Sequence, residues 1–253
     1  MRKKVVLLSG GLDSTLAFVM SRTMYDRKSI GLFVDMGQPY SSKEERVVDY
    51  LQNKYGGIVK LKVPIITSEN NNVPTIEDQI IPGRNFTLAA LAANYGEEIW
   101  LSALDGEMHN YMPDKSRHFF DLTQLALSQA YGRQIVFRTP FATMTKVEAV
   151  KFALEIKVPE SLIRRTSTCY HEEYDRCGEC SACFKRWVAL SLNYIEEDYR
   201  VDPRTSAFAA EYEGKLISAI ERDDFTHYSK KRIKEVLKAI GKLEHLNKVR
   251  GLL

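Results

Sequence analysis

Glycines and hydroxyl side chains interrupt the first apolar run of this chain, and their order is suited to phosphate binding. The run Lys4 to Leu8 is followed by Ser9-Gly10-Gly11-Leu12-Asp13-Ser14, and the apolar pattern resumes at Thr15 to Met20. Adjacent glycines allow a tight turn and a close backbone approach to a ligand, and the N–H groups at a helix start favour anions. Ser9 and Ser14 add hydroxyl donors, and Asp13 adds a carboxylate suited to Mg²⁺. This segment is predicted to cradle phosphates beside a cation.

The loop differs from the two commonest phosphate-binding motifs. No Lys follows the glycines, so it is not G-x-x-x-x-G-K-[ST], and it does not match G-x-G-x-x-G. The six residues SGGLDS, between a strand and a helix, resemble the pyrophosphate loop of the PP-loop ATP pyrophosphatases. That resemblance implies cleavage of ATP between its α and β phosphates through an adenylated intermediate. The alternative is a Gly-Gly turn between two core elements.

All four cysteines lie close together in the second half of the chain, at Cys169, Cys177, Cys180 and Cys183. Their spacing, C-x₇-C-x₂-C-x₂-C, is typical of metal ligands. Four thiolates close a tetrahedral Zn²⁺ site and leave no open position, so we expect structural zinc. An iron–sulfur cluster and unliganded core cysteines are the alternatives. Disulfides are not expected, because we predict a cytoplasmic protein.

Strands and helices alternate in the way typical of a parallel sheet covered on both faces. The sequence predicts five strands, at residues 4–8, 29–35, 58–63, 98–104 and 134–140. Capping boxes are expected at Ser42 to Glu45 and at Thr145 to Glu148. The predicted fold class is therefore α/β, with a doubly wound, mostly parallel five-stranded sheet. We expect an ATP-binding domain at residues 1–160 and a zinc-knuckle and helical C-terminal region at residues 161–253.

Ligands of such sheets bind beyond the carboxyl ends of the strands, so the segments that follow the strands are further candidates. Asp35 and Gln38 follow the second strand and should border the nucleotide. Arg84 follows a Pro-Gly turn at a helix start and is the candidate for an α-phosphate or adenylate contact; a surface arginine that caps a neighbouring loop is the alternative. Tyr111 and Asp114 follow the fourth strand and are the substrate-binding candidates.

Composition and charge exclude some classes of protein. The chain is 44% apolar and 27% charged, and its apolar runs are too short to span a membrane. No room precedes the phosphate loop for a signal peptide, so we expect a cytoplasmic location. Residues 229–253 carry eight Lys or Arg against two Glu. We expect this tail to pack against the main domain or a second copy in a homodimer; a zinc-knuckle protein that binds nucleic acid is the alternative.

An ordered set of motifs resembles the 7-cyano-7-deazaguanine synthases over residues 4–195. The set is SGGLDS, FVDMGQ after the second strand, IPGRN, RTP at the fifth strand and CGEC-x₂-C. The resemblance implies a ligase that adenylates 7-carboxy-7-deazaguanine with ATP and lets ammonia displace AMP to give the amide. It then adenylates the amide oxygen and eliminates AMP to leave the nitrile.

The resemblance also implies functions for particular residues. Zn²⁺ is expected on the four cysteines, and Ser9, Asp13, Ser14 and Arg84 are expected to act on the phosphates with Mg²⁺. ATP is expected to contact Leu8, Ser9, Gly10, Gly11, Leu12, Asp13, Ser14, Thr15, Leu16, Ala17 and Phe18.

Two features depart from the family. The substrate loop reads Tyr111-Met112-Pro113-Asp114-Lys115 where the family tends to have Tyr-Pro-Asp-Cys, and the chain continues well beyond the knuckle helix. Asp114 is expected to accept from the N1–H and amino edge of the deazaguanine, with Glu107 or Asp105 as alternatives. A variant that stops at the amide, or that transfers the deazaguanine to a nucleic acid or another macromolecule, is the second functional hypothesis.

Overall fold

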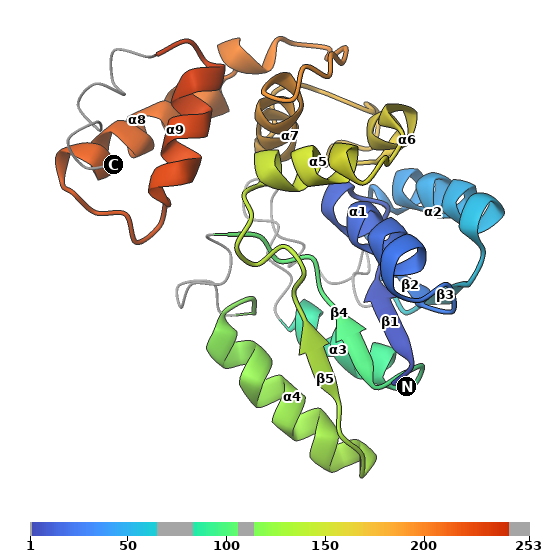
Figure 1. Ribbon diagram of the computed structural model, residues 1–253. Coiled ribbons are helices and arrows are strands. Elements are labelled where there is room, and N and C mark those ends of the chain that lie inside the picture. Colours follow the sequence, from blue (N-terminus) through green and yellow to red (C-terminus); the bar gives the residue numbers. More distant parts are fainter. Residues whose placement is uncertain (1, 65–82, 106–113, 243–253) are drawn as a thin grey trace.

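A parallel sheet of five strands forms the centre of the protein (Figure 1). The computed structural model describes residues 2–64, 83–105 and 114–242. The strands are β1 (Lys4–Leu7), β2 (Ile30–Asp35), β3 (Ile58–Lys62), β4 (Glu98–Trp100) and β5 (Val136–Arg138). Their order is β3-β2-β1-β4-β5, with every pair parallel. The predicted α/β class and parallel five-stranded sheet are therefore confirmed. Successive strands are added on one side of β1 up to β3 and on its other side from β4 onward.

Helices cover both faces of this sheet. They are α1 (Leu12–Met20), α2 (Ser41–Tyr55), α3 (Arg84–Ala93), α4 (Arg117–Tyr131), α5 (Lys146–Glu155), α6 (Glu160–Arg165), α7 (Ser181–Ser191), α8 (Ala207–Glu221) and α9 (Lys230–Ala239), with a π-helical turn η1 (Ser21–Tyr25) and a 3-10 turn η2 (Pro203–Thr205). Successive residues of a strand face opposite ways. Val6 of β1 accordingly packs with α1, α2 and α5, and Val5 packs with α3 and α4. None of the described helices is long and apolar enough to cross a membrane.

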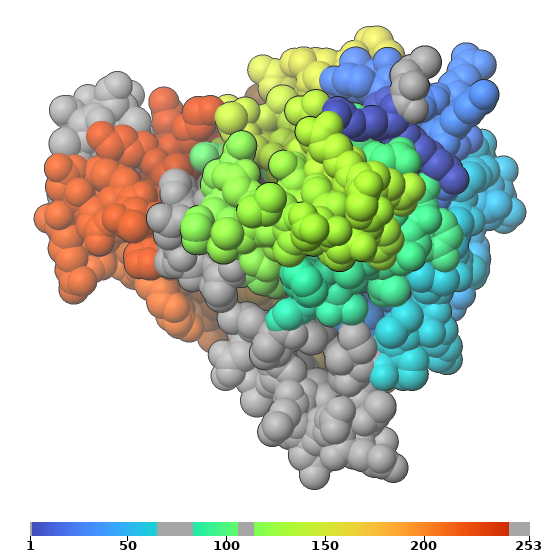
Figure 2. Space-filling model, turned by 90° about the horizontal axis from the view of Figure 1, so that it is seen from below, coloured from blue at the N-terminus to red at the C-terminus, as the bar shows by residue number. Residues whose placement is uncertain are grey.

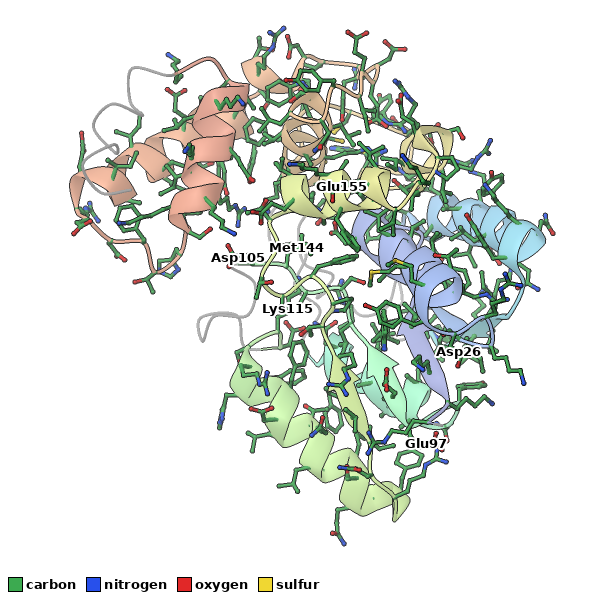
Figure 3. All side chains as sticks on the ribbon, viewed as in Figure 1. Asp26, Glu97, Asp105, Lys115, Met144 and Glu155 are labelled. Carbon is green, nitrogen blue, oxygen red and sulfur yellow. The ribbon has the colours of Figure 1, made fainter. Side chains whose placement is uncertain are left out.

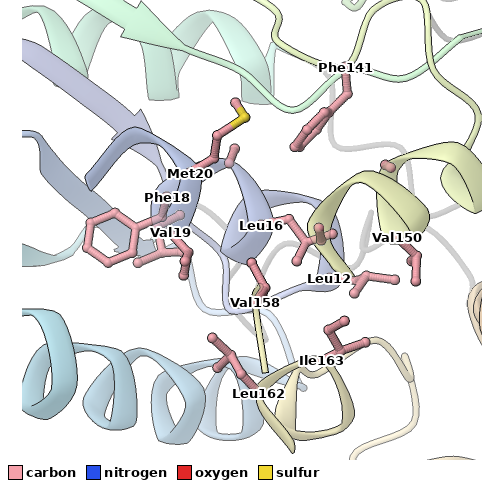
Figure 4. Packing of buried hydrophobic residues seen from close by; sticks show 14 of the residues in the cluster. Leu12, Leu16, Phe18, Val19, Met20, Phe141, Val150, Val158, Leu162 and Ile163 are labelled. Carbon is pink, nitrogen blue, oxygen red and sulfur yellow. The ribbon is translucent and has the colours of Figure 1, made fainter. Parts of the chain in front are cut away.

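Helix α1 is buried along almost its whole length (Figure 4). Leu16 and Phe18 lie in one core cluster with Val150 of α5 and Leu162 of α6. Burial of side chains of this size favours folding by roughly 1.5–3 kcal/mol each. The helix that follows the glycine loop is therefore anchored on the sheet, and this anchoring fixes the loop at its start.

The last two helices form a small unit beside the α/β body, seen as the orange and red lobe in Figure 2. Ile233 and Leu237 of α9 are fully buried against Leu216 of α8 and Phe184 of α7. This packing covers the apolar stripe of α9 within the chain. The described part of the tail, residues 229–242, thus packs mainly on α7 and α8 of the C-terminal region, and the expected contact with a second copy stays a prediction.

Several predicted boundaries shift in the structure. The strand expected at residues 98–104 ends at Trp100, and the last predicted strand is shortened to Val136–Arg138. The capping box at Thr145 and Glu148 is present, but the one expected at Ser42 and Glu45 is wrong. The N-cap of α2 is Tyr40, two residues before Ser42, and the Glu45 carboxylate instead pairs with Lys60 of β3 at 2.5 Å. Helix α6 was not predicted.

Candidate nucleotide site and metal centre

The glycine loop, residues 8–14, joins β1 to α1 and is held by hydroxyl contacts of its own. The Ser9 and Ser14 hydroxyls lie 3.0 Å apart, and the Ser14 hydroxyl accepts from the Ser9 N–H at 3.1 Å. The Ser9 hydroxyl also accepts from the Gly11 N–H at 3.3 Å. Helix α1 starts immediately afterwards, with Gly11 as its N-cap and no side-chain cap. The helix thus keeps N–H groups at its start for a ligand, as expected for an anion cradle.

Gly10 has no allowed replacement in this turn. Its φ is +71°, a left-handed conformation that favours glycine. A Cβ atom built on it would lie 2.6 Å from the carbonyl oxygen of Glu44. The Gly10 carbonyl also accepts from the Ser167 N–H at 2.9 Å. The loop therefore fits tightly between α2 and the segment that precedes the cysteines.

Asp13 lies in the first turn of α1 and forms an ion pair with Lys146, the first residue of α5. This pair uses the carboxylate oxygen Oδ2. The other oxygen, Oδ1, is buried and has no hydrogen-bond partner among the described residues. A carboxylate oxygen left in this state fits a divalent cation, which prefers hard oxygen ligands.

A cavity of about 370 Å³ opens beside the loop, within the size range of small-molecule sites. Predicted site residues that line it are Leu8, Ser9, Gly11, Leu12, Asp13, Ser14, Gln38 and Arg84. The lining also includes three lysines, at positions 115, 146 and 185. Together with Arg84 these cations make the cavity suited to a polyphosphate.

Other residues predicted to contact ATP do not line this cavity. Leu16, Ala17 and Phe18 are at most 2% exposed and belong to the core, and Thr15 is fully buried behind them. Gly10 shapes the turn, while the Asp35 carboxylate accepts from the Gly37 N–H at 2.9 Å. Residues 15–18 belong to the buried face of α1, which packs on the sheet and so anchors the loop.

Glu44 of α2 lines the cavity and was not among the predicted site residues. Glu44 is half-buried in the cavity wall, and removal of its carboxyl group from water raises its pKa to about 7, although a hydrogen bond from Gln38 at 2.8 Å opposes the shift. Burial, together with the charge of Glu44, also raises the pKa of Tyr40 to about 12. The only signal for Glu44 in the sequence is its place after FVDMGQ, which also fits a solvated helix face.

The predicted substrate loop is described only in part, because Tyr111 and Glu107 lie outside the described residues. Asp114 does not line the cavity, but its backbone carbonyl accepts from the Asn85 side chain at 3.0 Å. Asp105 and Lys115 lie with Met144 beyond the carboxyl ends of β4 and β5, whereas Glu97 lies at the opposite ends (Figure 3). The start and end of this loop therefore lie on the side of the sheet that holds the cavity.

The four cysteines form a compact buried cluster. Their Sγ atoms all lie within 4.8 Å of one another, and the sequence-predicted ligand set is thus brought together. The N–H groups of Glu179 and Cys180 both donate to the Cys177 sulfur at 3.3 Å. Burial raises the pKa of the Cys177 thiol to about 11, and a cation is needed to hold such a group as a thiolate at neutral pH. The donor set fits a tetrahedral metal ion.

The metal loop, residues 169–183, is closed by the segment that follows α7. Gly178 has φ +84°, and a Cβ atom there would lie 1.8 Å from the Val201 carbonyl oxygen. The Val201 N–H donates to the Cys177 carbonyl at 3.1 Å. The buried Lys43 ammonium donates to the carbonyls of Cys169 at 3.2 Å and Tyr174 at 2.8 Å, and also to that of His171. The metal loop is therefore fixed both to the chain after α7 and to α2.

A buried arginine links the metal loop to the phosphate loop. Arg186 of α7 is fully buried and donates to Glu197 at 2.6 and 2.8 Å. It also donates to the hydroxyls of Thr166 at 2.6 Å and Thr168 at 3.0 Å, the neighbours of Ser167. Burial acts to raise the pKa of Glu197, but the hydrogen bonds and charge of Arg186 lower it. Sequence patterns miss this residue because its partners come from two separate segments, residues 163–168 and Glu197.

The fold and the loop define a PP-loop α/β protein with an attached cluster of four cysteines that could hold a metal ion. Comparison with known proteins agrees with this class. The chain matches the family described as "Queuosine biosynthesis protein QueC" over residues 3–193. The chain belongs to this family.

Three curated relatives are named 7-cyano-7-deazaguanine synthase. The protein of Methanoculleus marisnigri is 31% identical over 225 residues, which cover 78% of this chain and 97% of the relative. That of Methanobrevibacter smithii is 27% identical, covering 78% of this chain and 96% of the relative. That of Rickettsia akari is 26% identical, covering 78% of this chain and 98% of the relative. The matched family region ends before η2, α8 and α9.

Proposed function

We propose that this protein is an ATP-dependent carbon–nitrogen ligase that converts 7-carboxy-7-deazaguanine and ammonia to 7-cyano-7-deazaguanine. The observation that carries the proposal is a single cavity that is lined by the SGGLDS loop, including Asp13, and by four cationic side chains. The chain that forms this cavity belongs to the family described above. The names of the relatives supply the product, and the carboxylate substrate follows from the motif resemblance described in the sequence analysis.

In this proposal, the chain acts on ATP mainly by positioning and electrostatics. The loop N–H groups and the hydroxyls of Ser9 and Ser14 bind the β and γ phosphates, and Arg84 contacts the α phosphate. Asp13 offers Oδ1 to Mg²⁺, which neutralises charge on the phosphates when it is bound. Lys146 holds the other oxygen of Asp13 and keeps the carboxylate aimed at the cavity.

We further propose that Glu44 accepts protons during the reaction. The attacking ammonia nitrogen must lose a proton as the amide forms, and the amide nitrogen must lose two as the nitrile forms. Glu44 lies in the cavity wall, and burial raises its pKa to about 7, near the value that favours a general base at neutral pH. The Gln38 side chain, which donates at 2.8 Å, orients the carboxylate.

The four cysteines would hold Zn²⁺ in a structural site. Their buried, clustered sulfurs support four-coordinate binding, with no position left for a substrate. Arg186 and Lys43 would connect this metal site to the walls of the cavity through their hydrogen bonds to Thr166 and to the Cys169 carbonyl.

Turnover with 7-carboxy-7-deazaguanine, ATP, Mg²⁺ and ammonium tests the proposal when nucleotides and products are both identified by mass spectrometry. We expect AMP, pyrophosphate and the nitrile. ADP as the main nucleotide product would refute the PP-loop chemistry. Accumulation of the amide alone, with AMP, would replace this function by the variant that stops one step earlier.

The basic tail does not favour the nucleic-acid hypothesis. Lys231 pairs with Glu148 at 3.0 Å, and Lys242 pairs with Glu213 at 3.7 Å. The Arg232 guanidinium stacks over the ring of Tyr212, 5.3 Å from its centre. Three of the basic side chains of residues 229–242 thus contact other residues of the same chain. The expected homodimer and cytoplasmic location remain predictions, and the solution mass tests the first of them.

A further inference from the structure

Helix α9 lies outside the matched family region, yet it contacts the helix that carries Lys146. The Thr145 hydroxyl, at the N-cap of α5, donates to the Glu235 carboxylate of α9 at 2.6 Å. Lys231 of α9 pairs with Glu148, the other member of the capping box, at 3.0 Å. Both contacts thus reach the start of α5, one at its N-cap residue and the other at its third residue.

The Thr145 hydroxyl has one proton and serves two partners. Its oxygen accepts from the Glu148 N–H at 3.2 Å, and its proton goes to Glu235. Thr145 is 4% exposed, so water cannot readily replace Glu235 as the acceptor. An oriented hydroxyl completes the cap, and a negative charge at a helix start is itself favourable.

The next residue after this cap is Lys146, whose ammonium pairs with Asp13 in the phosphate loop. We propose that α9 is a positioning element of the nucleotide site: Glu235 fixes the start of α5 through Thr145, and α5 in turn holds Lys146 against Asp13. Lys231 adds a smaller contribution, because its ion pair with Glu148 is largely exposed. The proposal concerns phosphate binding alone and does not depend on the identity of the carboxylate substrate.

Apolar packing also connects α9 to the start of α5. Ile233, Val236 and Leu237 are at most 4% exposed and hold the helix on α7 and α8. Val147 of α5 packs against this same cluster and against the core beneath α1. A displacement of α9 would therefore directly shift the start of α5.

The test measures the affinity of the full-length protein for a non-hydrolysable ATP analogue with Mg²⁺, alongside the melting temperature. We expect Glu235→Ala to weaken analogue binding about fivefold, the factor that corresponds to a typical lost cap. Glu235→Gln should restore binding, because its amide oxygen still accepts from Thr145. Lys234→Ala, an exposed position on the same helix, is the matched control and should bind like the wild type.

A double-mutant cycle separates positioning from general stability. If Glu235 acts through Lys146, then Glu235→Ala should add nothing to the loss of affinity caused by Lys146→Met. A Glu235→Ala protein that melts lower but binds the analogue normally would overturn the proposal, as would additive effects in the cycle. Failure of the proposed ligase reaction would leave these binding results unchanged.

Discussion

The Lys43 ammonium lies 3.2 Å from the carbonyl oxygen of Cys169, so α2 is bonded directly to the first of the four clustered cysteines. Two further carbonyls of the metal loop accept from the same ammonium. We expect Lys43→Met to leave these acceptors unpaired and to lower the free energy of unfolding by about 2–4 kcal/mol. Thermal melts and zinc content by atomic absorption check this. Lys54→Met, exposed on the same helix, should change neither, and a normal Lys43→Met protein would contradict the link.

Removal of one cysteine should abolish the metal centre. Structural zinc contributes on the order of 10 kcal/mol in isolated finger peptides, and the cysteine segment has little apolar surface of its own. We therefore expect Cys180→Ser to lower the zinc content and the melting temperature together. Ser181→Ala at the adjacent position is the control. A variant that loses zinc but melts like the wild type would overturn the structural role.

Glu44→Gln should lower activity while it stabilises the protein above neutral pH. Wild-type turnover should rise with pH through about 7, as the buried carboxyl loses its proton, and the variant should be slow at every pH. Because the folded pKa exceeds the usual value, the folded state binds this proton more tightly than the unfolded chain does. The associated stability is complete below about pH 4.5 and is lost as pH rises through about 7.

The Gln side chain avoids this loss, so the variant should gain on the order of 1 kcal/mol at pH 8. Paired pH–rate profiles and melts at pH 5 and pH 8 test both parts. An active Glu44→Gln enzyme with an unchanged pH profile would exclude Glu44 as the base.

Asp114→Asn should raise the KM for 7-carboxy-7-deazaguanine about tenfold or more and leave that for ATP nearly unchanged. A carboxylate is the natural acceptor for the N1–H and amino edge of the base, and an unmatched polar group in a site is costly. Asp121→Asn, on the exposed face of α4, is the control. Equal effects on both KM values would mean that Asp114 supports the loop without reading the base.

Gly10→Ala should destroy nucleotide binding. The new methyl group would lie 2.6 Å from the Glu44 carbonyl, in a backbone conformation that already disfavours alanine. Gly132→Ala is the matched control, because Gly132 has φ +59° in the left-handed region and nothing within 4 Å of a Cβ atom built on it. We expect a similar strain cost of about 1 kcal/mol in the control and a larger loss, with no ATP binding, in Gly10→Ala. Equal losses in the two variants would show that backbone strain alone explains the result and that the close approach of the loop to α2 does not contribute.

Sequence reasoning succeeded where the physical cause is local. The SGGLDS turn, the cysteine spacing and the Thr145 capping box depend on neighbours within a few residues, and each is present in the structure. It failed where a distant residue competes: the Glu45 carboxylate pairs with Lys60, so no box forms with Ser42.

Long-range partners explain what was missed at the site. Lys146 meets Asp13 across 133 positions of the chain, and Lys43 meets Cys169 across 126. In the sequence both lysines look like ordinary residues of surface helices. Only the parallel crossover of the sheet, which brings α1, α2 and α5 to one face, gives them a function.

The bond between the Ser167 N–H and the Gly10 carbonyl also bears on how the protein is made. During synthesis the glycine loop leaves the ribosome well before its partner Ser167, because a large part of the sheet and its helices lies between them in the sequence. A nascent chain that has not yet exposed residue 167 lacks one wall of the loop, however well β1 and α1 have formed. The glycine loop is therefore completed only when residue 167 has emerged, just ahead of the first of the four cysteines.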